Sequence, residues 1–210
     1  MRKQIVRPVI ALAALAVTTA SCGDVVRTGR SPVYLVIDSL QAAQGNNPAQ
    51  MSGVLTSDVI TLVTSPAPCT PTTPCPTIFN DYGQAVLRIT DKSIPVGGIS
   101  APSSHNEVTI NRYHVSFRRA DGRNTPGVDV PYAFDGAVTG TVGASTALTL
   151  PFEIVKHVAK AESPLVQLID SRTVINTIAD VTFYGRDQVG NDISVTGSIT
   201  IEFGNFGDKS

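Results

Sequence analysis

An alternation of apolar and polar side chains over residues 179–203 constrains the fold more than any other feature of the chain. A period of two residues gives a strand one buried face and one wet face, whereas a helix would spread the same apolar set around its axis. Residues 185–191, which are rich in glycine, aspartate and asparagine, interrupt the alternation and favour a turn. We therefore predict a long antiparallel hairpin whose inward side chains are Ala179, Val181, Phe183, Ile193, Val195, Gly197, Ile199, Ile201 and Phe203.

Most of the remaining chain also favours strands separated by turn signals. The stretch 33–40 is apolar enough to be buried on both faces, only 156–163 favours a helical turn, and 165–169 fits either a strand or a helix. This pattern, with hardly any helix, is typical of a sandwich or barrel. We predict an all-β protein, an antiparallel β-sandwich over 33–204 with a C-terminal tail at 205–210, and the expected strands before the hairpin are 33–40, 53–63, 84–90, 107–119, 128–134, 137–142 and 147–155.

The strand expected at 107–119 contains a change of parity. Val108 and Ile110 occupy even positions, whereas Tyr113, Val115 and Phe117 occupy odd positions. All five can face the core only if one extra residue enters the strand between the two groups. We therefore predict a β-bulge near residues 111–112.

The N-terminus is typical of a secretion signal. Three basic residues lie within positions 1–7, and an apolar segment of about eleven residues follows at 8–18. This segment is shorter than the roughly 20 residues that a membrane-spanning helix needs. We predict a signal peptide at 1–21. The whole chain has a formal charge of -1, and the segment to be removed is basic, so the remaining chain is acidic and lacks the basic stripe expected of a nucleic-acid partner.

The four residues Thr19-Ala20-Ser21-Cys22 resemble the lipobox of bacterial lipoproteins. The resemblance implies cleavage before Cys22, a diacylglyceryl thioether on its sulfur and acylation of its new amino group, with residues 22–32 as a tether. Thr19 replaces the aliphatic residue usual in that family, so secretion with an unmodified Cys22 is one alternative, and retention of the apolar segment as an anchor helix is the other. The family retains proteins at the inner membrane when Asp follows the cysteine; Gly23 occupies that position here, which favours the outer membrane.

The other two cysteines, Cys69 and Cys75, lie in a segment that contains five prolines between positions 66 and 76. Outside the cytoplasm two nearby cysteines usually oxidise together, so we predict a disulfide that closes a small loop. A zinc site would need further ligands, and no Cys or His lies close by in the sequence to supply them. A redox-active pair is the other alternative, although such pairs favour two intervening residues at the start of a helix.

Two segments resemble the immunoglobulin-like and fibronectin type III-like sandwich modules of bacterial surface proteins. Residues 179–191, which end in Asp187-Gln188-Val189-Gly190-Asn191, are similar to the last hairpin of these modules, and residues 108–122 are similar to their central strand and the turn after it. The resemblance implies an immunoglobulin-like sandwich. One such module has about 100 residues, so extra strands or insertions are expected in this longer domain.

Few residues indicate a catalytic or ligand-binding site. The three histidines, His105, His114 and His157, are far apart in the sequence, and no motif for a nucleophile, a zinc site or a phosphate loop is present. The turn Asp187–Asn191 offers oxygen atoms to calcium, but one turn supplies too few of them, and the same residues also suit hydrogen bonds to their own backbone. We predict no cofactor, and a basic set at Arg112, Arg118, Arg119, Arg123 and Lys156 is expected on a solvated face of the sheet.

These features favour a non-catalytic, lipid-anchored protein of the cell envelope that acts as a structural or protein-binding module. One alternative is a calcium- or glycan-dependent adhesion module, although the chain has no Trp and only five Tyr for stacking against sugars. The second alternative is a hydrolase built on a sandwich, which would gather carboxylates or histidines in one pocket. The sequence does not identify the partner protein or the oligomeric state.

Overall fold

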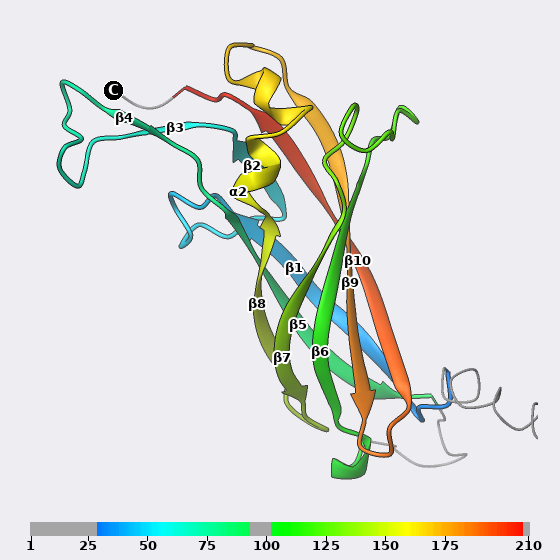
Figure 1. Ribbon diagram of the computed structural model, residues 1–210. Helices are drawn as coiled ribbons and strands as arrows, with labels where there is room; N and C mark the ends of the chain where they lie inside the picture. The colour runs from blue at the N-terminus through cyan, green and yellow to red at the C-terminus, as the bar shows by residue number, and fades with distance from the viewer. Residues whose placement is uncertain (1–28, 93–101, 208–210) are drawn as a thin grey trace, which may run out of the picture.

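The computed structural model describes residues 29–92 and 102–207, and almost all of its regular structure is strand (Figure 1). One helical turn, α2 (His157–Lys160), and two short 3₁₀ turns, Ser104–Asn106 and Leu165–Leu168, complete the regular elements. No helix within these described ranges is long and apolar enough to cross a membrane. The strands are β1 (Val33–Ala43), β2 (Val54–Asp58), β3 (Thr61–Val63), β4 (Cys75–Thr77), β5 (Asp81–Asp91), β6 (Val108–Arg118), β7 (Phe134–Val142), β8 (Leu148–Val155), β9 (Ile175–Asp187) and β10 (Asp192–Gly204).

Two sheets pack face to face as a β-sandwich, which confirms the predicted fold class. One sheet has the strand order β1-β5-β8 and the other has the order β2-β10-β9-β6-β7. If β5, β6, β8, β9 and β10 are equated with strands B, C, E, F and G, their distribution between the sheets is that of an immunoglobulin fold. All pairings are antiparallel except that of β2 with β10, which is parallel.

The predicted C-terminal hairpin forms the centre of the five-stranded sheet. β9 and β10 pair from Asp192 opposite Arg186 to Phe203 opposite Ile175. Val181, Phe183, Ile199 and Ile201 are all buried on the same side, as the alternation predicts. Their side chains meet those of β1, β5 and β8 between the two sheets, and this single apolar cluster is the core of the sandwich.

The predicted bulge is present in β6. Ile110 lies opposite Gly185 of β9 and Arg112 lies opposite the adjacent Tyr184, so one residue of β6 is left over between them. The extra residue, Asn111, is exposed, and the apolar residues on both sides of it face the core. The change of parity in the sequence therefore reflects a real bulge.

Three expectations about strands are corrected. β1 is not buried on both faces: Tyr34 and Asp38 are exposed because β1 is an edge strand whose outer face meets solvent. The expected strand 53–63 is divided into β2 and β3, because the chain leaves the sandwich after Asp58. The expected strand at 128–134 is an irregular loop up to Phe134, where β7 begins.

The ends of the domain are attached to the sandwich more closely than the predicted boundaries imply. Ser31 is buried, and the amide of Lys92 donates a hydrogen bond of 2.9 Å to the carbonyl of Pro32, within the expected tether. At the other end of the chain, the side-chain amide of Asn205 donates a 2.7 Å hydrogen bond to the carbonyl of Ile169. The predicted signal peptide and Cys22 lie outside the described residues.

Candidate functional site

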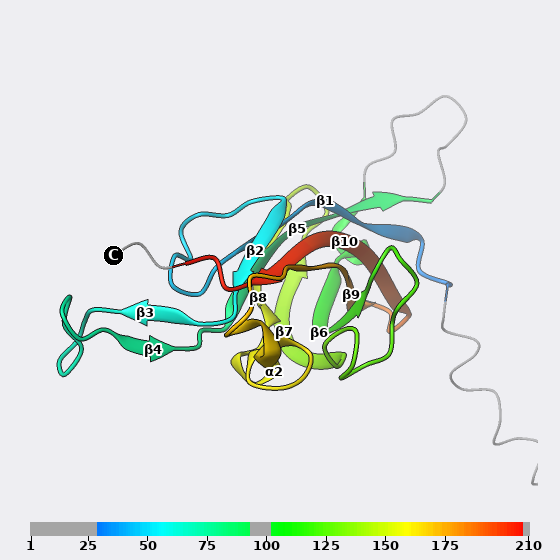
Figure 2. The same ribbon diagram turned by 90° about the horizontal axis from the view of Figure 1, so that it is seen from above.

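The hairpin formed by β3 and β4 projects from one end of the sandwich (Figures 1 and 2). The strands pair over only three residues, from Thr61 opposite Thr77 to Val63 opposite Cys75. No charged residue occurs from Val59 to Asn80, although 16% of the whole chain is charged. Leu62 is 45% exposed on this hairpin, and residues 64–68 and 71–74 are exposed as well. The hairpin is therefore an uncharged surface that extends into solvent.

The disulfide predicted between Cys69 and Cys75 is formed, with an S–S distance of 2.08 Å. It closes the tip of the hairpin, where Thr70 and Thr73 also exchange two backbone hydrogen bonds. A covalent bridge and a dense set of prolines both limit the conformations of this segment. The tip is consequently stiff although it has few contacts with the sandwich, and stiffness lowers the entropy lost when a surface binds a partner.

The opposite end of the sandwich contains a cleft of about 540 Å³ between the start of β1 and the β9–β10 hairpin. Lys92, Arg112 and Arg186 line it together with Tyr34 and Asp192. The guanidinium of Arg186 lies 2.6 Å from the Asp192 carboxylate, and the Lys92 ammonium lies 5.1 Å from the centre of the Tyr34 ring. The first described residue, Gly29, also lines this cleft, so the chain enters the domain at this end.

A second cleft, of about 500 Å³, opens between β7 and β8. Tyr113 reaches across from β6, and its hydroxyl accepts a 3.3 Å hydrogen bond from the amide of Glu153 on the edge strand β8. The ring can cross β7 only because Gly136 has no side chain, since a Cβ at that position would overlap it. Burial raises the pKa of the Tyr113 phenol. This arrangement joins the two sheets and closes one side of the sandwich.

The turn Asp187–Asn191 uses its polar groups internally. One carboxylate oxygen of Asp187 accepts hydrogen bonds from the amides of Val189 and Asn191, at 3.1 and 2.8 Å, and the other accepts one from the Asn191 side chain at 2.8 Å. Burial raises the pKa of Asp187, but hydrogen bonds from Asn191 and from the turn outweigh it, so the pKa lies below its ordinary value. The arrangement matches the alternative in which the turn residues bond their own backbone.

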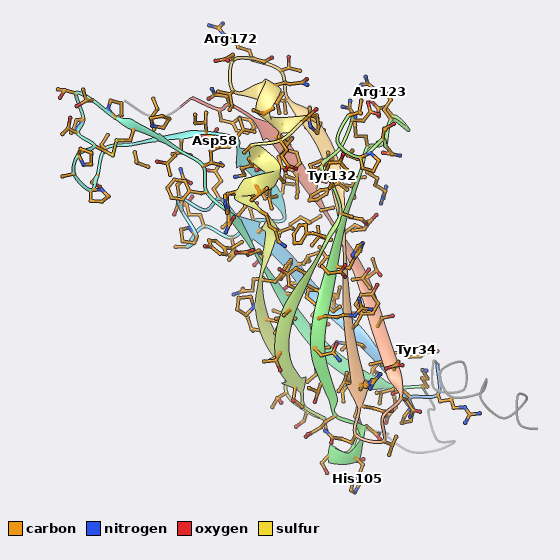
Figure 3. All side chains as sticks on the ribbon, viewed as in Figure 1. Tyr34, Asp58, His105, Arg123, Tyr132 and Arg172 are labelled. Atoms are coloured by element: carbon orange, nitrogen blue, oxygen red, sulfur yellow. A yellow bond between two sulfur atoms is a disulfide. The ribbon has the colours of Figure 1, made fainter. Side chains whose placement is uncertain are left out.

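The structure does not bring the three histidines together. His105 lies in the 3₁₀ turn at the end of the sandwich (Figure 3). His114 is on the outer face of β6, where its Nδ1 lies 3.2 Å from the carboxylate of Asp135. His157 begins α2, and its Nδ1 lies 2.8 Å from the side-chain oxygen of Asn80. Among the described residues, no three His, Cys, Asp or Glu side chains are gathered closely enough to hold a metal ion.

The basic set lies on the outer surface, as expected, and most of it is engaged in exposed ion pairs. Arg118 lies 2.7 Å from the carboxylate of Asp180, and both Arg119 and Arg123 contact Asp121. Hydrogen bonds from these two arginines lower the pKa of Asp121 to about 2. Exposed pairs of this kind contribute little to stability. Arg112 lies 3.3 Å from the carboxylate of Asp135 and also stacks over the ring of Tyr184, and Lys156 lies over the ring of Phe134.

Sequence reasoning missed a buried ion pair. The ammonium of Lys160, on α2, lies 2.9 Å from the carboxylate of Asp81, and both side chains are only 1% exposed. The ammonium also donates a 2.9 Å hydrogen bond to the backbone carbonyl of Asp58, which lies beside α2 in Figure 3. Ser57 and the amide of Gly45 donate to the same carboxylate. Burial raises the pKa of Asp81, while Lys160 acts in the opposite direction.

No protein-family model matches the chain, and no curated protein is significantly similar to it.

Proposed function

We propose that this protein is a non-catalytic, lipid-anchored protein of the cell envelope that binds a partner protein through the β3–β4 hairpin. The anchor is the diacylglyceryl group on Cys22, and Gly23 favours the outer membrane. The hairpin is the binding surface, and the sandwich holds it away from the membrane. The proposal names no enzyme activity and no cofactor.

One observation carries the proposal: the hairpin and the point of chain entry lie at opposite ends of the sandwich. Gly29 lies at one end, and the loop closed by Cys69 and Cys75 projects from the other (Figures 1 and 2). A chain anchored through Cys22 would thus present the hairpin on its membrane-distal side. Strands of up to 13 residues run between the two ends and act as a rigid spacer.

The composition of the hairpin favours a protein as the partner. A segment without charged residues cannot form salt bridges with nucleic acid or with anionic polysaccharide. Proline-rich segments bind well to apolar and aromatic grooves on proteins, because they lose little conformational entropy on binding. The exposed Leu62 adds apolar area to the same surface. An uncharged groove on a protein is therefore the matching surface.

A non-catalytic role is favoured by the positions of the polar side chains. Asp187 is satisfied within its own turn, and His114 and His157 contact different residues on different elements. Catalytic side chains converge on one substrate position, and these three do not share one.

Site-specific photo-crosslinking in intact cells tests the binding surface. A benzoylphenylalanine in place of Thr72, at the exposed tip, is expected to give a cross-link to one protein, identified by mass spectrometry. The same residue in place of Thr149, which is exposed on β8, is the matched control and is expected to give none. A cross-link from position 149 alone, or from neither position, would contradict the proposal.

The anchor is tested separately by intact-mass measurement of the protein extracted from membranes. We expect the mature chain to begin at Cys22 and to carry the added mass of the acyl chains. Cys22→Ser is expected to release the protein from the membrane fraction. An unmodified Cys22 in the mature chain would refute the anchor without affecting the hairpin experiment.

A further inference from the structure

The end of the sandwich where the chain enters carries exposed apolar side chains at fixed positions. Val189 is 76% exposed, the highest value among the large hydrophobic residues described, and it stands at the tip of the turn between β9 and β10. Tyr34, at the start of β1, is 56% exposed at the same end (Figure 3). An apolar side chain at the tip of a turn makes no contribution to the core of the domain.

The turn holds Val189 rigidly. The carboxylate of Asp187 accepts hydrogen bonds from the amide of Val189 itself and from both donors of Asn191. Gly190 has a φ of 86°, a left-handed conformation that glycine adopts without strain, and it completes the turn. The residues first considered as calcium ligands therefore act as the support of one exposed valine.

Basic side chains lie at the same end of the sandwich as these apolar residues. Arg30 is exposed one residue after the start of the described chain, and Lys92 stacks on the ring of Tyr34. Lys92 also donates a 3.1 Å hydrogen bond to the carbonyl of Gly29, which fixes the point of chain entry at this end. Long basic side chains and tyrosines are the residues that favour the interface between lipid and water.

The length of the expected tether brings this end close to a bilayer. Six residues lie between Cys22 and Gly29, which makes seven steps along the chain, and a fully extended chain spans at most about 3.5 Å per step, so the reach is about 25 Å. A domain held this closely can contact the surface in which its anchor is inserted. The anchor then keeps the domain at a high effective concentration relative to the membrane surface, so even weak contacts between them are populated.

We propose that this end of the sandwich, formed by Val189, Tyr34, Arg30 and Lys92, docks on the phospholipid bilayer. Val189 and Tyr34 enter the interfacial layer, and the two basic groups lie among the phosphates of the headgroups. The inference rests on the proposed anchor, which sets which end of the domain faces the membrane. It extends the proposed function by fixing the orientation of the domain, with the β3–β4 hairpin pointing away from the membrane.

Acidic groups at this end limit the electrostatic part of the contact. Asp192 is paired with Arg186, Asp187 is held within its turn, and Asp91 and Glu107 also lie at this end. The net charge of the surface is therefore small. We expect the contact to depend mainly on the apolar residues and to weaken only modestly as salt is raised.

The chain has no tryptophan, so a single introduced one reports its own surroundings. The mature chain from Cys22, with its Cys69–Cys75 disulfide intact, is coupled through the thiol of Cys22 to maleimide-phospholipid in vesicles of phosphatidylcholine and phosphatidylglycerol. Val189→Trp is expected to give blue-shifted emission that is quenched by doxyl-labelled lipids. Val128→Trp, at a 65% exposed position in the loop at the other end, is the matched control and is expected to stay water-like.

Water-like emission from both variants, without quenching by doxyl lipids, would overturn the inference. Equal quenching of both would also overturn it, because it would show no preferred end. Thermal unfolding of each variant confirms that the fold is kept, and both substitutions lie at exposed positions. Since Cys22 is coupled chemically, the experiment stands even if the natural protein carries no lipid, and it is independent of the hairpin cross-links.

Discussion

The ammonium of Lys160 lies 2.9 Å from the carboxylate of Asp81 in the interior of the domain, with both side chains 1% exposed. The pair links α2 to the first residue of β5, and through the carbonyl of Asp58 it also reaches the end of β2. Three segments that are distant in sequence are therefore fastened at one point. Removing one charge leaves the other buried without compensation.

We predict that Lys160→Met, which keeps the length of the side chain and removes its charge, lowers the free energy of unfolding by about 3–5 kcal/mol. Urea unfolding at pH 7 measures this loss. The matched control is Arg88→Met, which breaks an exposed ion pair with Asp38 and is expected to cost less than about 1 kcal/mol. A loss for Lys160→Met no larger than that of the control would show that the buried pair does not fasten the three segments.

The turn that presents Val189 gives a second prediction, which depends on pH. Because the pKa of Asp187 is lower in the folded protein than in the unfolded chain, its carboxylate stabilises the fold above the ordinary pKa of 3.8. That stabilisation is lost as the pH falls through the lower, folded value. Asp187→Ala is therefore expected to cost about 1–3 kcal/mol at pH 7 and progressively less at acidic pH.

Urea unfolding of both proteins at pH 7, 5 and 3 measures this difference. The gap between the wild-type protein and Asp187→Ala should be similar at the two higher values and smaller at pH 3. A gap that stays constant down to pH 3 would mean that the ionised carboxylate is not what stabilises the turn.

The relation between sequence and structure differs between the hairpin and the ion pair. The alternation at 179–203 and the parity change at 108–117 follow from local geometry, because each side chain of a strand must face one side or the other. Both predictions were confirmed. Lys160 lies in a polar segment of a kind usually exposed to solvent, and when buried it bonds the carbonyl of Asp58, 102 residues earlier in the chain. Such a contact follows from the packing of whole elements and leaves no local pattern.

The same distinction explains the error at 53–63. Both parities of this segment carry aliphatic residues, so the pattern indicates a strand without showing where it ends. β2 ends at Asp58 because its partner β10 ends at Gly204, directly opposite, and the chain then continues into the projecting hairpin. The disulfide could be predicted because it joins two cysteines that are close in sequence; the direction in which its loop projects could not.

A third prediction concerns Tyr113, which joins the two sheets through its hydrogen bond with the amide of Glu153. Tyr113→Phe removes the hydroxyl that accepts the amide hydrogen of Glu153 and is expected to cost about 1 kcal/mol. Gly136→Ala is expected to cost more, about 1–3 kcal/mol, because the added methyl group overlaps the ring of Tyr113. Thermal or urea unfolding ranks the two. If Gly136→Ala proved as stable as the wild-type protein, the ring of Tyr113 would have room to move, and its position between the sheets would not be fixed by Gly136.

A fourth prediction separates the hairpin from the sandwich. Cys69→Ser with Cys75→Ser opens the loop, but the hairpin has few contacts with the core and gains mobility in the folded as well as in the unfolded protein, so global unfolding is expected to change by less than the roughly 2–4 kcal/mol typical of a disulfide. The hairpin itself should become mobile and sensitive to proteolysis within residues 64–74. Urea unfolding and limited proteolysis distinguish the two effects. A large global loss would mean that the bridge supports the sandwich as well as the tip.

The bulge at Asn111 gives the last prediction. Deleting Asn111 removes the extra residue and joins Ile110 directly to Arg112, whose β9 partners Gly185 and Tyr184 are already adjacent. The apolar residues on both sides of the deletion therefore keep their core face in an unbroken alternation. The deletion is expected to keep the fold and to cost less than about 3 kcal/mol, because only the local pairing with β7 is disturbed. Asn111→Ala keeps the bulge and changes only an exposed side chain, so it should stay within about 0.5 kcal/mol of the wild-type protein. Urea unfolding followed by far-UV circular dichroism compares the two variants. A loss above about 4 kcal/mol for the deletion variant would contradict this prediction and would show that the extra residue is itself required for the pairing of β6.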